Sequence, residues 1–257
     1  MRQIVVVGIG AGNPDHITVQ AIKALNRLDV VFVLDKGAEK DELAQLRREL
    51  CDRYITARPY RMVEIPDPPR DRLSPDYLAG VDDWHERRAA LYEAAIAREL
   101  GESETGGILA WGDPSLYDST IRILERVRAR EVVRFDYEVI PGITSLQALT
   151  AAHRATLNEI GGEVRITTGR RLNEQPVAAN TSVAVMLDGG TAFQNIEAPE
   201  DTHILWGAYV GTPREILVSG RLTEVADEIV RLRDSARAEA GWIMDAYILK
   251  RLRKGQS

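Results

Sequence analysis

Three short segments carry glycine where the main chain would come close to a bound molecule. They are residues 8–14 (GIGAGNP), 111–118 (WGDPSLYD) and 140–147 (IPGITSLQ), and each follows an apolar stretch. Because glycine has no Cβ, the backbone at such a turn can approach a ligand at the carboxyl edge of a sheet. The pattern is typical of small-molecule binding.

Each turn also has an explanation that needs no ligand. Asp113 before Pro114 is suited to a helix N-cap, and Thr144 with Gln147 makes a capping box. Residues 8–14 fit a plain strand-to-helix turn. They also partly fit the dinucleotide-binding fingerprint, with Asp35 as the ribose-binding acid. Asn13 in place of the third glycine opposes that second interpretation.

Composition narrows the function classes. The 257 residues, 44% hydrophobic and 28% charged, predict a globular protein of two modest domains. A net charge of -6 disfavours nucleic acid and anionic membranes as partners. The four histidines are too dispersed for a metal site, and the single cysteine, Cys51, favours a reducing compartment, the cytoplasm. The first residues predict neither a signal peptide nor a membrane span.

The elements that position these turns are indicated by Val- and Ile-rich runs that alternate with amphipathic stretches, which predicts an α/β protein with a mainly parallel sheet. A boundary at Pro141-Gly142 gives domains 1–141 and 142–257. We expect strands at 4–9, 30–34, 108–111, 137–140, 164–167, 183–187, 204–210 and 243–249. We expect helices at 16–27, 40–50, 82–100, 115–130, 144–153 and 222–233. Residues 56–80, with five prolines and arginines 58, 61, 70 and 72, predict a long loop.

The order G-x-G-x-G-x-P, then G-D-P, then P-G-I-T-S resembles the tetrapyrrole (corrin/porphyrin) methylase family over nearly the whole chain. The resemblance implies two αβα domains with mainly parallel or mixed sheets, an active site in the interdomain cleft and a homodimer. Segments 31–36, 64–68, 167–171, 186–189 and 206–211 resemble one branch of the family. That branch replaces the acetyl group of precorrin-5 by a methyl group from S-adenosylmethionine, which leaves as S-adenosylhomocysteine, and releases acetate.

The resemblance also implies site residues. The methyl donor is expected at Gly10, Pro14, Gly112, Asp113, Leu116, Tyr117, Thr144, Ser145, Met186, Leu187, Ala208, Tyr209, Trp242 and Ile243. Asp113 is expected to accept hydrogen bonds from the donor's amino group. Arg58, Arg61, Arg170 and Arg171 are candidates for the substrate's carboxylates, since guanidinium groups bind carboxylates in pairs of hydrogen bonds. Asp118, His153 and Asp188 are candidates for the base that deacetylation needs. No metal is expected.

Three alternatives remain. Another member of the same family would act on a different precorrin position, on ribosomal RNA or on diphthine, and the acidic composition disfavours RNA. A nicotinamide-dependent oxidoreductase would use residues 8–14 and Asp35. A non-catalytic binding module would bind its ligand without turnover.

Overall fold

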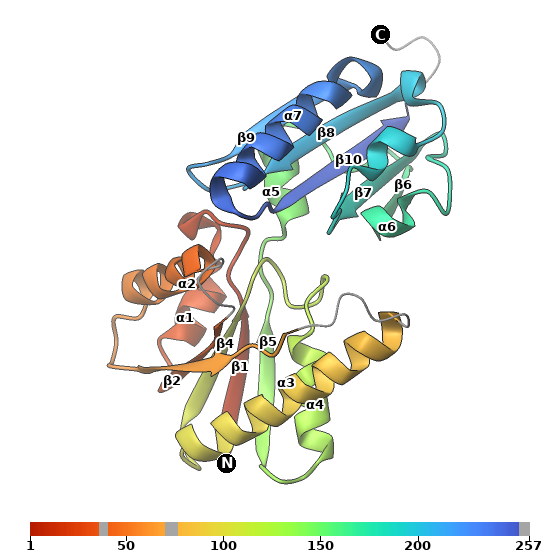
Figure 1. Cartoon of the computed structure of the whole chain (residues 1–257). Coiled ribbons are helices and arrows are strands. Elements are labelled where there is room, and N and C mark those ends of the chain that lie inside the picture. Colours follow the sequence, from red (N-terminus) through yellow and green to blue (C-terminus); the bar gives the residue numbers. More distant parts are fainter. Residues whose placement is uncertain (36–40, 70–76, 252–257) are drawn as a thin grey trace. The chain divides into compact units, whose positions relative to one another are not determined.

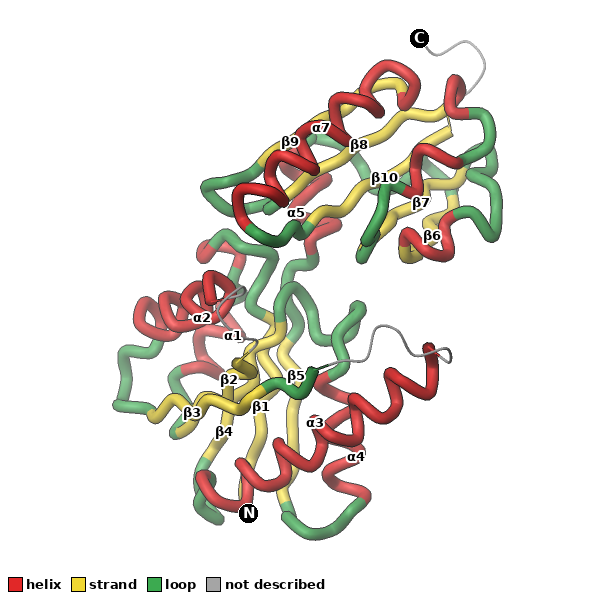
Figure 2. Tube along the Cα trace, viewed as in Figure 1, coloured by secondary structure: helices red, strands yellow, loops and turns green. Residues whose placement is uncertain are grey.

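The structure, a computed structural model, describes residues 1–35, 41–69 and 77–251. The chain divides into two compact units, each with its own five-stranded sheet (Figures 1 and 2). Unit 1 contains residues 1–10 and 14–144, and unit 2 contains residues 11–13 and the chain from residue 145. The α/β fold expected from the sequence is confirmed.

The first sheet is entirely parallel. Its strands are β1 (Arg2–Gly8), β2 (Val30–Asp35), β3 (Arg61–Pro66), β4 (Thr105–Ala110) and β5 (Phe135–Ile140), in the order β3-β2-β4-β1-β5. All neighbouring pairs run in the same direction. The carboxyl ends of all five strands therefore lie at one edge, which receives the turns after β1, β4 and β5.

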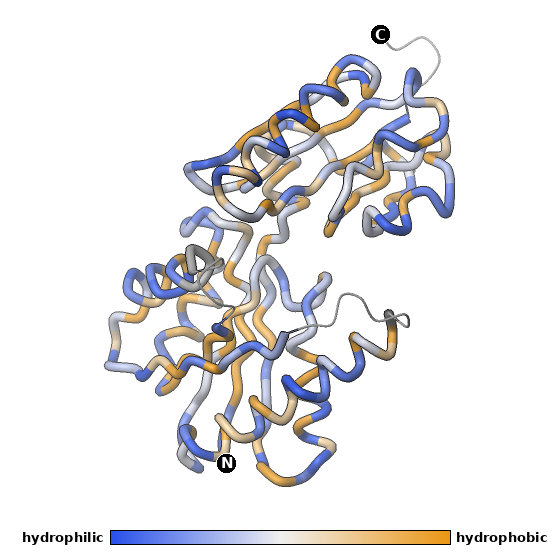
Figure 3. The backbone as a smooth tube through the Cα atoms, in the orientation of Figure 1, coloured by the Kyte–Doolittle hydropathy of each residue, from blue (hydrophilic) through white to orange (hydrophobic). Residues whose placement is uncertain are grey.

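Alternating side chains of β1 explain the three layers of unit 1. Ile4 and Val6 pack in one apolar cluster with α3 (Tyr77–Glu99) and α4 (Thr120–Ala129). Val5 and Val7 pack in a second cluster with α1 (Val19–Leu25) and α2 (Asp41–Tyr54). A strand that is buried on both faces is apolar throughout, as the sequence IVVV is. Figure 3 shows the hydrophobic colouring of these strands.

The second sheet is mixed. Its strands are β6 (Glu163–Thr168), β7 (Thr181–Met186), β8 (Thr202–Ala208), β9 (Ile216–Arg221) and β10 (Asp245–Arg251), in the order β6-β7-β10-β8-β9. Only β6 and β7 pair in parallel. The long helix α7 (Leu222–Ala240) packs on the face that carries Trp206 and Tyr247. Helix α5 (Ser145–Ala152) contacts the other face, where a Cβ on Gly207 would meet Leu149.

Several boundaries differ from those expected. The stretch predicted as a loop contains the edge strand β3, which ends at Pro66, and α3 begins at Tyr77 rather than at residue 82. Arg70 and Arg72 lie outside the described residues. Helix α4 begins at Thr120, not at residue 115, and β9 was not expected. Within the described ranges, no helix is both long and apolar enough to cross a membrane.

Candidate active site

Backbone contacts between glycines build the carboxyl edge of the first sheet. A Cβ on Gly8 would lie 2.6 Å from the Gly142 nitrogen, and a Cβ on Gly142 would overlap the Gly112 carbonyl oxygen. No side chain fits at either position. The need for glycine at these two strand ends therefore follows from close packing of the turns themselves, independently of a ligand.

Gly10 and Gly112 face each other in a short antiparallel bridge. The Gly10 N–H donates to the Gly112 carbonyl oxygen at 3.3 Å, and the Gly112 N–H donates to Gly10 at 2.8 Å. Both residues have positive φ, 84° and 67°. A Cβ on Gly10 would lie 3.0 Å from the His16 Cβ, whereas the nearest atom to a Cβ on Gly112, in Thr144, is 3.6 Å away. Only Gly112 has space beside it.

Asp113 joins two of the turns. Its Oδ1 accepts the Ser115 N–H at 2.8 Å and the Ser115 hydroxyl, and its Oδ2 accepts the Gly142 N–H at 2.8 Å. Partial burial acts to raise the pKa of Asp113, but these hydrogen bonds outweigh it and hold the pKa below its ordinary value. Since α4 begins only at Thr120, the expected cap of that helix by Asp113 is wrong. A carboxylate accepts about four hydrogen bonds, so Oδ2 retains room for one from a ligand.

Three expected donor ligands have a left-handed backbone although they are not glycine. The φ angles of Tyr117, Leu187 and Tyr209 are 52°, 54° and 49°. Such residues cost roughly 1–3 kcal/mol each and are enriched where a site needs a fixed geometry. Tyr117 and Leu187 also expose 44% and 65% of their surface.

The expected residues of unit 2 share one edge of the second sheet. Thr168 pairs with Met186, and Asp245 pairs with Ala208, so β6, β7 and β8 end where β10 begins. Ala246 pairs with both Met186 and Gly207, which closes the row. The structure therefore brings together Met186, Leu187, Ala208, Tyr209, Trp242 and Ile243.

Tyr209 stabilises this edge through two hydrogen bonds and a ring contact. Its N–H donates to the Met244 carbonyl oxygen at 2.9 Å, and its hydroxyl donates to the Trp242 carbonyl oxygen at 2.5 Å. The Tyr209 and Trp242 rings meet edge to face with centroids 5.1 Å apart. Ala208 and Tyr209 are buried, so these two residues support the edge and fix the segment that leads into β10.

Asp188 belongs to a buried polar network. Its Oδ1 accepts the Gly190 N–H at 3.0 Å, and its Oδ2 accepts the Tyr247 hydroxyl at 2.7 Å and the Ala192 N–H at 2.9 Å. Its carbonyl oxygen accepts a hydrogen bond from Arg233, which also pairs with Asp245 at 3.1 Å. Burial raises the pKa of Asp245 despite this partner. With three donors on its carboxylate, Asp188 holds the turn after β7 and is poorly suited to act as a base.

The other two candidates for the base differ in their surroundings. His153 Nε2 lies 3.0 Å from the Trp206 carbonyl oxygen, which can only accept, so this nitrogen carries the proton and ties α5 to β8. Asp118 accepts the Thr120 N–H at 2.7 Å, which caps the start of α4, and it lines a cavity of unit 1. Of the three candidates, Asp118 has the surroundings that best suit a base.

Arg58 and Arg61 lie at the amino edge of the first sheet, opposite the glycine turns. Arg61 pairs with Val30 at the start of β2, and its guanidinium binds the Glu104 carboxylate at 2.9 and 3.1 Å. Arg58 forms an ion pair with Asp29 at 3.3 Å. Their position at the edge opposite the glycine turns disfavours both arginines as substrate ligands.

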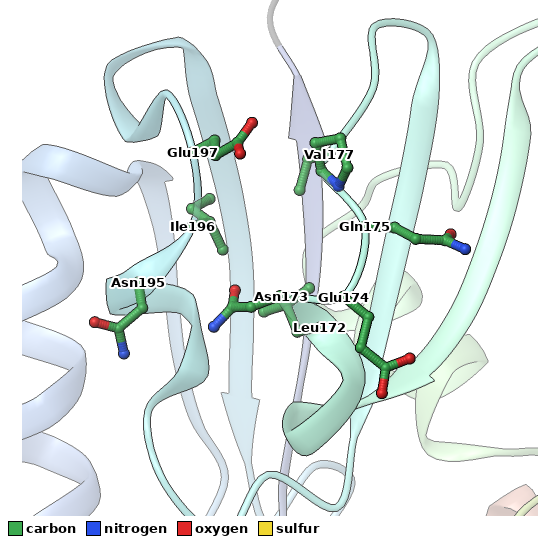
Figure 4. Close-up of a pocket in the computed structure, with 9 residues that line it drawn as sticks. Leu172, Asn173, Glu174, Gln175, Val177, Asn195, Ile196 and Glu197 are labelled. Atoms are coloured by element: carbon green, nitrogen blue, oxygen red, sulfur yellow. The ribbon is translucent and has the colours of Figure 1, made fainter.

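Arg170 and Arg171 lie at the expected edge, in the short helix α6 (Gly169–Leu172) that follows β6. Arg171 is exposed and pairs with Glu174 at 2.9 Å. A pocket of about 190 Å³ lies beside the end of this helix (Figure 4). Its wall includes Glu174 and Glu197 and none of the expected donor residues, so we do not assign the donor to it.

Two candidate site residues were missed by sequence reasoning. Among the described residues, the buried Trp111 Nε1 and Thr168 Oγ1 have no hydrogen-bond partner. Trp111 directly follows β4, and Thr168 is the last residue of β6. Unpaired buried polar atoms are rare in proteins, so both are candidates for ligand contacts. Both stand in segments that the sequence had marked, WGDP and TTGR, which was the available signal.

The structure does not support a dinucleotide site at the first turn. Pro14–His16 form a short 3₁₀ helix, and α1 begins only at Val19, with the Thr18 side chain as its cap. A pyrophosphate in the dinucleotide fold lies directly on the helix that opens at the glycine turn. Among the described residues, no group of three His, Cys, Asp or Glu side chains is arranged to hold a metal ion.

Comparison with known proteins gives a consistent result. The family model of the Tetrapyrrole (Corrin/Porphyrin) Methylases matches residues 3–226. The chain is 57% identical to the precorrin-6A synthase [deacetylating] of Sinorhizobium sp, over 98% of this chain and 96% of that protein. It is 28% identical to the precorrin-2 C(20)-methyltransferase of Sinorhizobium sp, over 56% of this chain and 55% of that enzyme.

Solved structures agree. The crystal structure of a cobalamin synthesis related protein, CobF, from Corynebacterium diphtheriae superposes with a TM-score of 0.83 at 39% identity, over 98% of this chain and 100% of that one. Uroporphyrin-III C-methyl transferase from Thermus thermophilus, complexed with S-adenosyl homocysteine, gives a TM-score of 0.58 at 20% identity, over 96% of this chain and 92% of that one. The latter likeness shows the shared fold.

Proposed function

The chain belongs to the tetrapyrrole (corrin/porphyrin) methylase family, and we propose that it catalyses the reaction of the precorrin-6A synthase (deacetylating) that it resembles. The protein is a methyltransferase of cobalamin biosynthesis. The proposed reaction replaces the acetyl group of precorrin-5 by a methyl group from S-adenosylmethionine. The products are precorrin-6A, acetate and S-adenosylhomocysteine.

One observation carries this proposal: the chain is 57% identical to that enzyme over 98% of its own length. Two other relatives, a precorrin-2 C(20)-methyltransferase and a cobalt-precorrin-4 C(11)-methyltransferase, are 28% and 25% identical to this chain and, by their names, act on other precorrin positions. The resemblance therefore favours this reaction over another member of the family. The same comparisons contradict a nicotinamide-dependent oxidoreductase.

We assign donor binding to the turns at the two edges. In unit 1 these supply Gly10, Pro14, Gly112, Asp113, Leu116, Tyr117 and Thr144, and in unit 2 they supply Ser145, Met186, Leu187, Ala208, Tyr209, Trp242 and Ile243. The chemistry of these edges fits the donor, because open backbone at Gly112, one free acceptor site on Asp113 and the unpaired Trp111 N–H suit a polar, zwitterionic molecule. When bound, S-adenosylmethionine supplies an electrophilic methyl group.

For the substrate, Arg170 and Arg171 are the proposed carboxylate ligands, since they lie at the carboxyl edge of the second sheet. A protein of net charge -6 needs a local positive group to bind a polyanion. The residues at both edges act chiefly by positioning the reactants, an effect that contributes up to roughly 7–11 kcal/mol. Asp118 is the proposed base that activates water for deacetylation.

Incubation of the protein with precorrin-5 and methyl-labelled S-adenosylmethionine tests the proposed function. We expect label in the tetrapyrrole, together with acetate and S-adenosylhomocysteine in equal amounts. Label transfer to precorrin-2 or to ribosomal RNA in preference to precorrin-5 would contradict the assignment to this branch. Binding of S-adenosylhomocysteine without turnover of any precorrin would favour the binding module.

We also propose a cytoplasmic homodimer. The family resemblance supports the dimer, and a single, buried free thiol at Cys51 suits a reducing compartment. The only other partner in the proposal is the small-molecule tetrapyrrole, with no nucleic acid and no membrane. Sedimentation equilibrium tests the oligomeric state, for which a monomer mass of 28.6 kDa would contradict the dimer.

A further inference from the structure

A small cavity of unit 1 is not used by the assignments of the donor and of the substrate carboxylates. It measures about 60 Å³ and lies at the carboxyl ends of β2 and β4. Its polar wall is formed by Arg47, Arg88, Tyr92, Asp118 and Thr120, and the rest of the wall is apolar. Asp118 and Thr120 follow the Gly112-Asp113 turn in sequence, so the cavity shares the edge at which the donor turns lie.

One wall of the cavity is fixed by ion pairing. Arg88 is 6% exposed and binds Asp67 through two hydrogen bonds, of 2.7 and 2.5 Å. The Trp84 ring stacks 3.6 Å from its guanidinium carbon, and the Trp84 N–H donates to the Pro68 carbonyl oxygen at 3.0 Å. Because the charge of Arg88 is matched by Asp67, Arg88 shapes the wall and is not an additional anion ligand.

Arg47 brings a second guanidinium to the cavity. Its Nε donates to the Leu109 carbonyl oxygen at 3.2 Å, which fixes its orientation. Burial lowers the pKa of Arg47, while the neighbouring Tyr92, Asp118 and Cys51 act to raise it. An anion or a carbonyl oxygen in the cavity would favour the charged form of this guanidinium further. The wall therefore suits a small ligand with an oxygen at one end and an apolar group at the other.

Size narrows the ligand. One water needs at least roughly 10–15 Å³ of such space, so the cavity admits a group of a few heavy atoms and not a porphyrin ring or an adenosine. We propose that this cavity binds the two-carbon acyl group that the reaction removes, first as the acetyl group of the substrate and then as acetate, with Arg47 as the ligand of its oxygen. The inference rests on the proposed function.

Acetate itself is the probe for the first experiment. Saturation-transfer NMR measures its binding to the wild-type protein, beside propionate and butyrate, and we expect a signal for acetate that falls with chain length. Arg47→Gln should weaken acetate binding tenfold or more, because it removes a charge-assisted hydrogen bond. Arg48→Gln is the matched control, since its neighbouring guanidinium is 39% exposed and pairs with Glu64. This variant should bind acetate like the wild type.

The comparison of acetate with propionate and butyrate tests the proposal even where Arg47→Gln does not fold. Equal binding of acetate and butyrate to the wild type would overturn the proposal. Folding of Arg47→Gln is verified by unchanged affinity for S-adenosylhomocysteine. A tetrapyrrole also has acetate side chains at its periphery, and one of these could occupy the cavity in place of the acetyl group. Kinetics distinguish the two occupants. With precorrin-5, loss of kcat in Arg47→Gln supports the acetyl group, whereas a raised KM at unchanged kcat would assign the cavity to a peripheral side chain and overturn the inference.

The two proposals fail in different ways. Release of acetate from precorrin-5 by a protein that does not bind free acetate would reject the cavity assignment and leave the reaction intact. Absence of acetate release by the wild type would reject the reaction itself.

Discussion

Gly112 and Gly10 both have positive φ, but a side chain would meet different surroundings at the two positions. At Gly10 a Cβ would press on His16, so a substitution there disturbs the turn whether or not a ligand binds. At Gly112 the nearest atom is 3.6 Å away, and only the backbone conformation opposes a Cβ. Gly112 is therefore the better position at which to test close approach of the donor.

Gly112→Ala should lose affinity for S-adenosylhomocysteine by tenfold or more, since the methyl group occupies space that the donor needs. The left-handed backbone should also cost roughly 1–2 kcal/mol, or about 2–4 °C in Tm for each kcal/mol. Gly161→Ala is the matched control, because its φ is 69°, nothing lies within 4 Å, and it precedes β6 at the opposite edge of the second sheet. Titration calorimetry compares the two variants, and equal donor affinity in both would remove Gly112 from the site.

Asp113 is a carboxylate whose ionised form holds two turns together. Its pKa is lowered in the folded state, so the stabilisation it gives is present above the ordinary pKa of about 3.9 and is lost as the pH falls through the lower folded value. Asp113→Asn should therefore lower Tm at pH 7. The loss in the free energy of unfolding should match the contribution of a charge-assisted hydrogen bond, roughly 1.5–3 kcal/mol.

The difference in Tm between Asp113→Asn and the wild type should shrink below about pH 4, because the wild-type carboxyl is protonated first in the unfolded state and then, at lower pH, in the folded state. Thermal unfolding from pH 3 to pH 7 measures it. Asp234→Asn, an exposed position on α7, is the control for the change in net charge. A difference that stayed constant over this range would show that ionisation of Asp113 does not hold the turns.

At this scale the sequence located the turns at the carboxyl edge of the first sheet but not the reasons for their glycines. GIG, WGD and IPG identified the edge, while the overlap among Gly8, Gly112 and Gly142 depends on three distant segments and is invisible in any one of them. The left-handed backbone of Tyr117, Leu187 and Tyr209 is likewise set by tertiary structure, since none of these residue types favours positive φ.

Among the elements, the six central strands were expected from the sequence, and of the four edge strands β5 and β6 were expected whereas β3 and β9 were not. The run IVVV in β1 is apolar on both faces, whereas RMVEIP in β3 and ILVSGR in β9 are mostly half-buried or exposed and lie at sheet edges. Prolines around β3 further suggested a loop, although an edge strand tolerates proline where no pairing is needed. Because β3 was not expected, Arg61 was predicted to lie in a surface loop. The structure places it at the amino edge of the first sheet.

Arg61 lies at the amino edge of its sheet, whereas Arg170 and Arg171 lie at the carboxyl edge of theirs. Changing Arg170 and Arg171 together to Gln should raise the KM for precorrin-5 by tenfold or more and leave the affinity for S-adenosylhomocysteine unchanged, because two carboxylate ligands are lost at the carboxyl edge. Arg61→Gln is the control: it removes a guanidinium from the opposite edge, where Glu104 is its partner, and should leave KM unchanged.

Steady-state kinetics with calorimetry test this pair. A parallel loss of both affinities in the Arg170 and Arg171 variant would indicate a folding defect in α6. A raised KM in Arg61→Gln would return the amino edge to consideration as a substrate surface.

For the whole molecule, the two sheets differ in the direction in which their strands pair. The first follows the parallel α/β pattern that alternating runs predict, while the second turns antiparallel at β10, a change that a buried run such as AYILK does not reveal. Nevertheless, the segments that we propose to bind donor and substrate lie at the carboxyl ends of β1, β4, β5, β6, β7 and β8 and just before β10, and the rule for ligand sites in α/β sheets places such sites at the carboxyl ends of strands. Fold class and motif order were readable, and the roles of Asp188 and His153 required the structure.

The last prediction concerns the order of the two chemical events. The acetyl group occupies the ring carbon that receives the methyl group, so deacetylation should come first: water adds to the acetyl carbonyl, the bond to the ring carbon breaks, acetate leaves, and the electron pair stays on the macrocycle. A base must take the proton of that water. Asp118, which lines the acetyl-sized cavity, is the residue placed to do so.

Asp118→Asn should therefore stop acetate release and methyl transfer together, each by about a hundredfold or more, which is the usual contribution of a general base. Affinity for S-adenosylhomocysteine should persist, and because Asn keeps an acceptor oxygen for the Thr120 N–H, the start of α4 should remain intact. Single-turnover assays that follow acetate and S-adenosylhomocysteine in one sample measure both events. A variant that consumed the methyl donor on precorrin-5 and released no acetate would show that the ring carbon accepts the methyl group before the acetyl group departs, and deacetylation first would then be wrong.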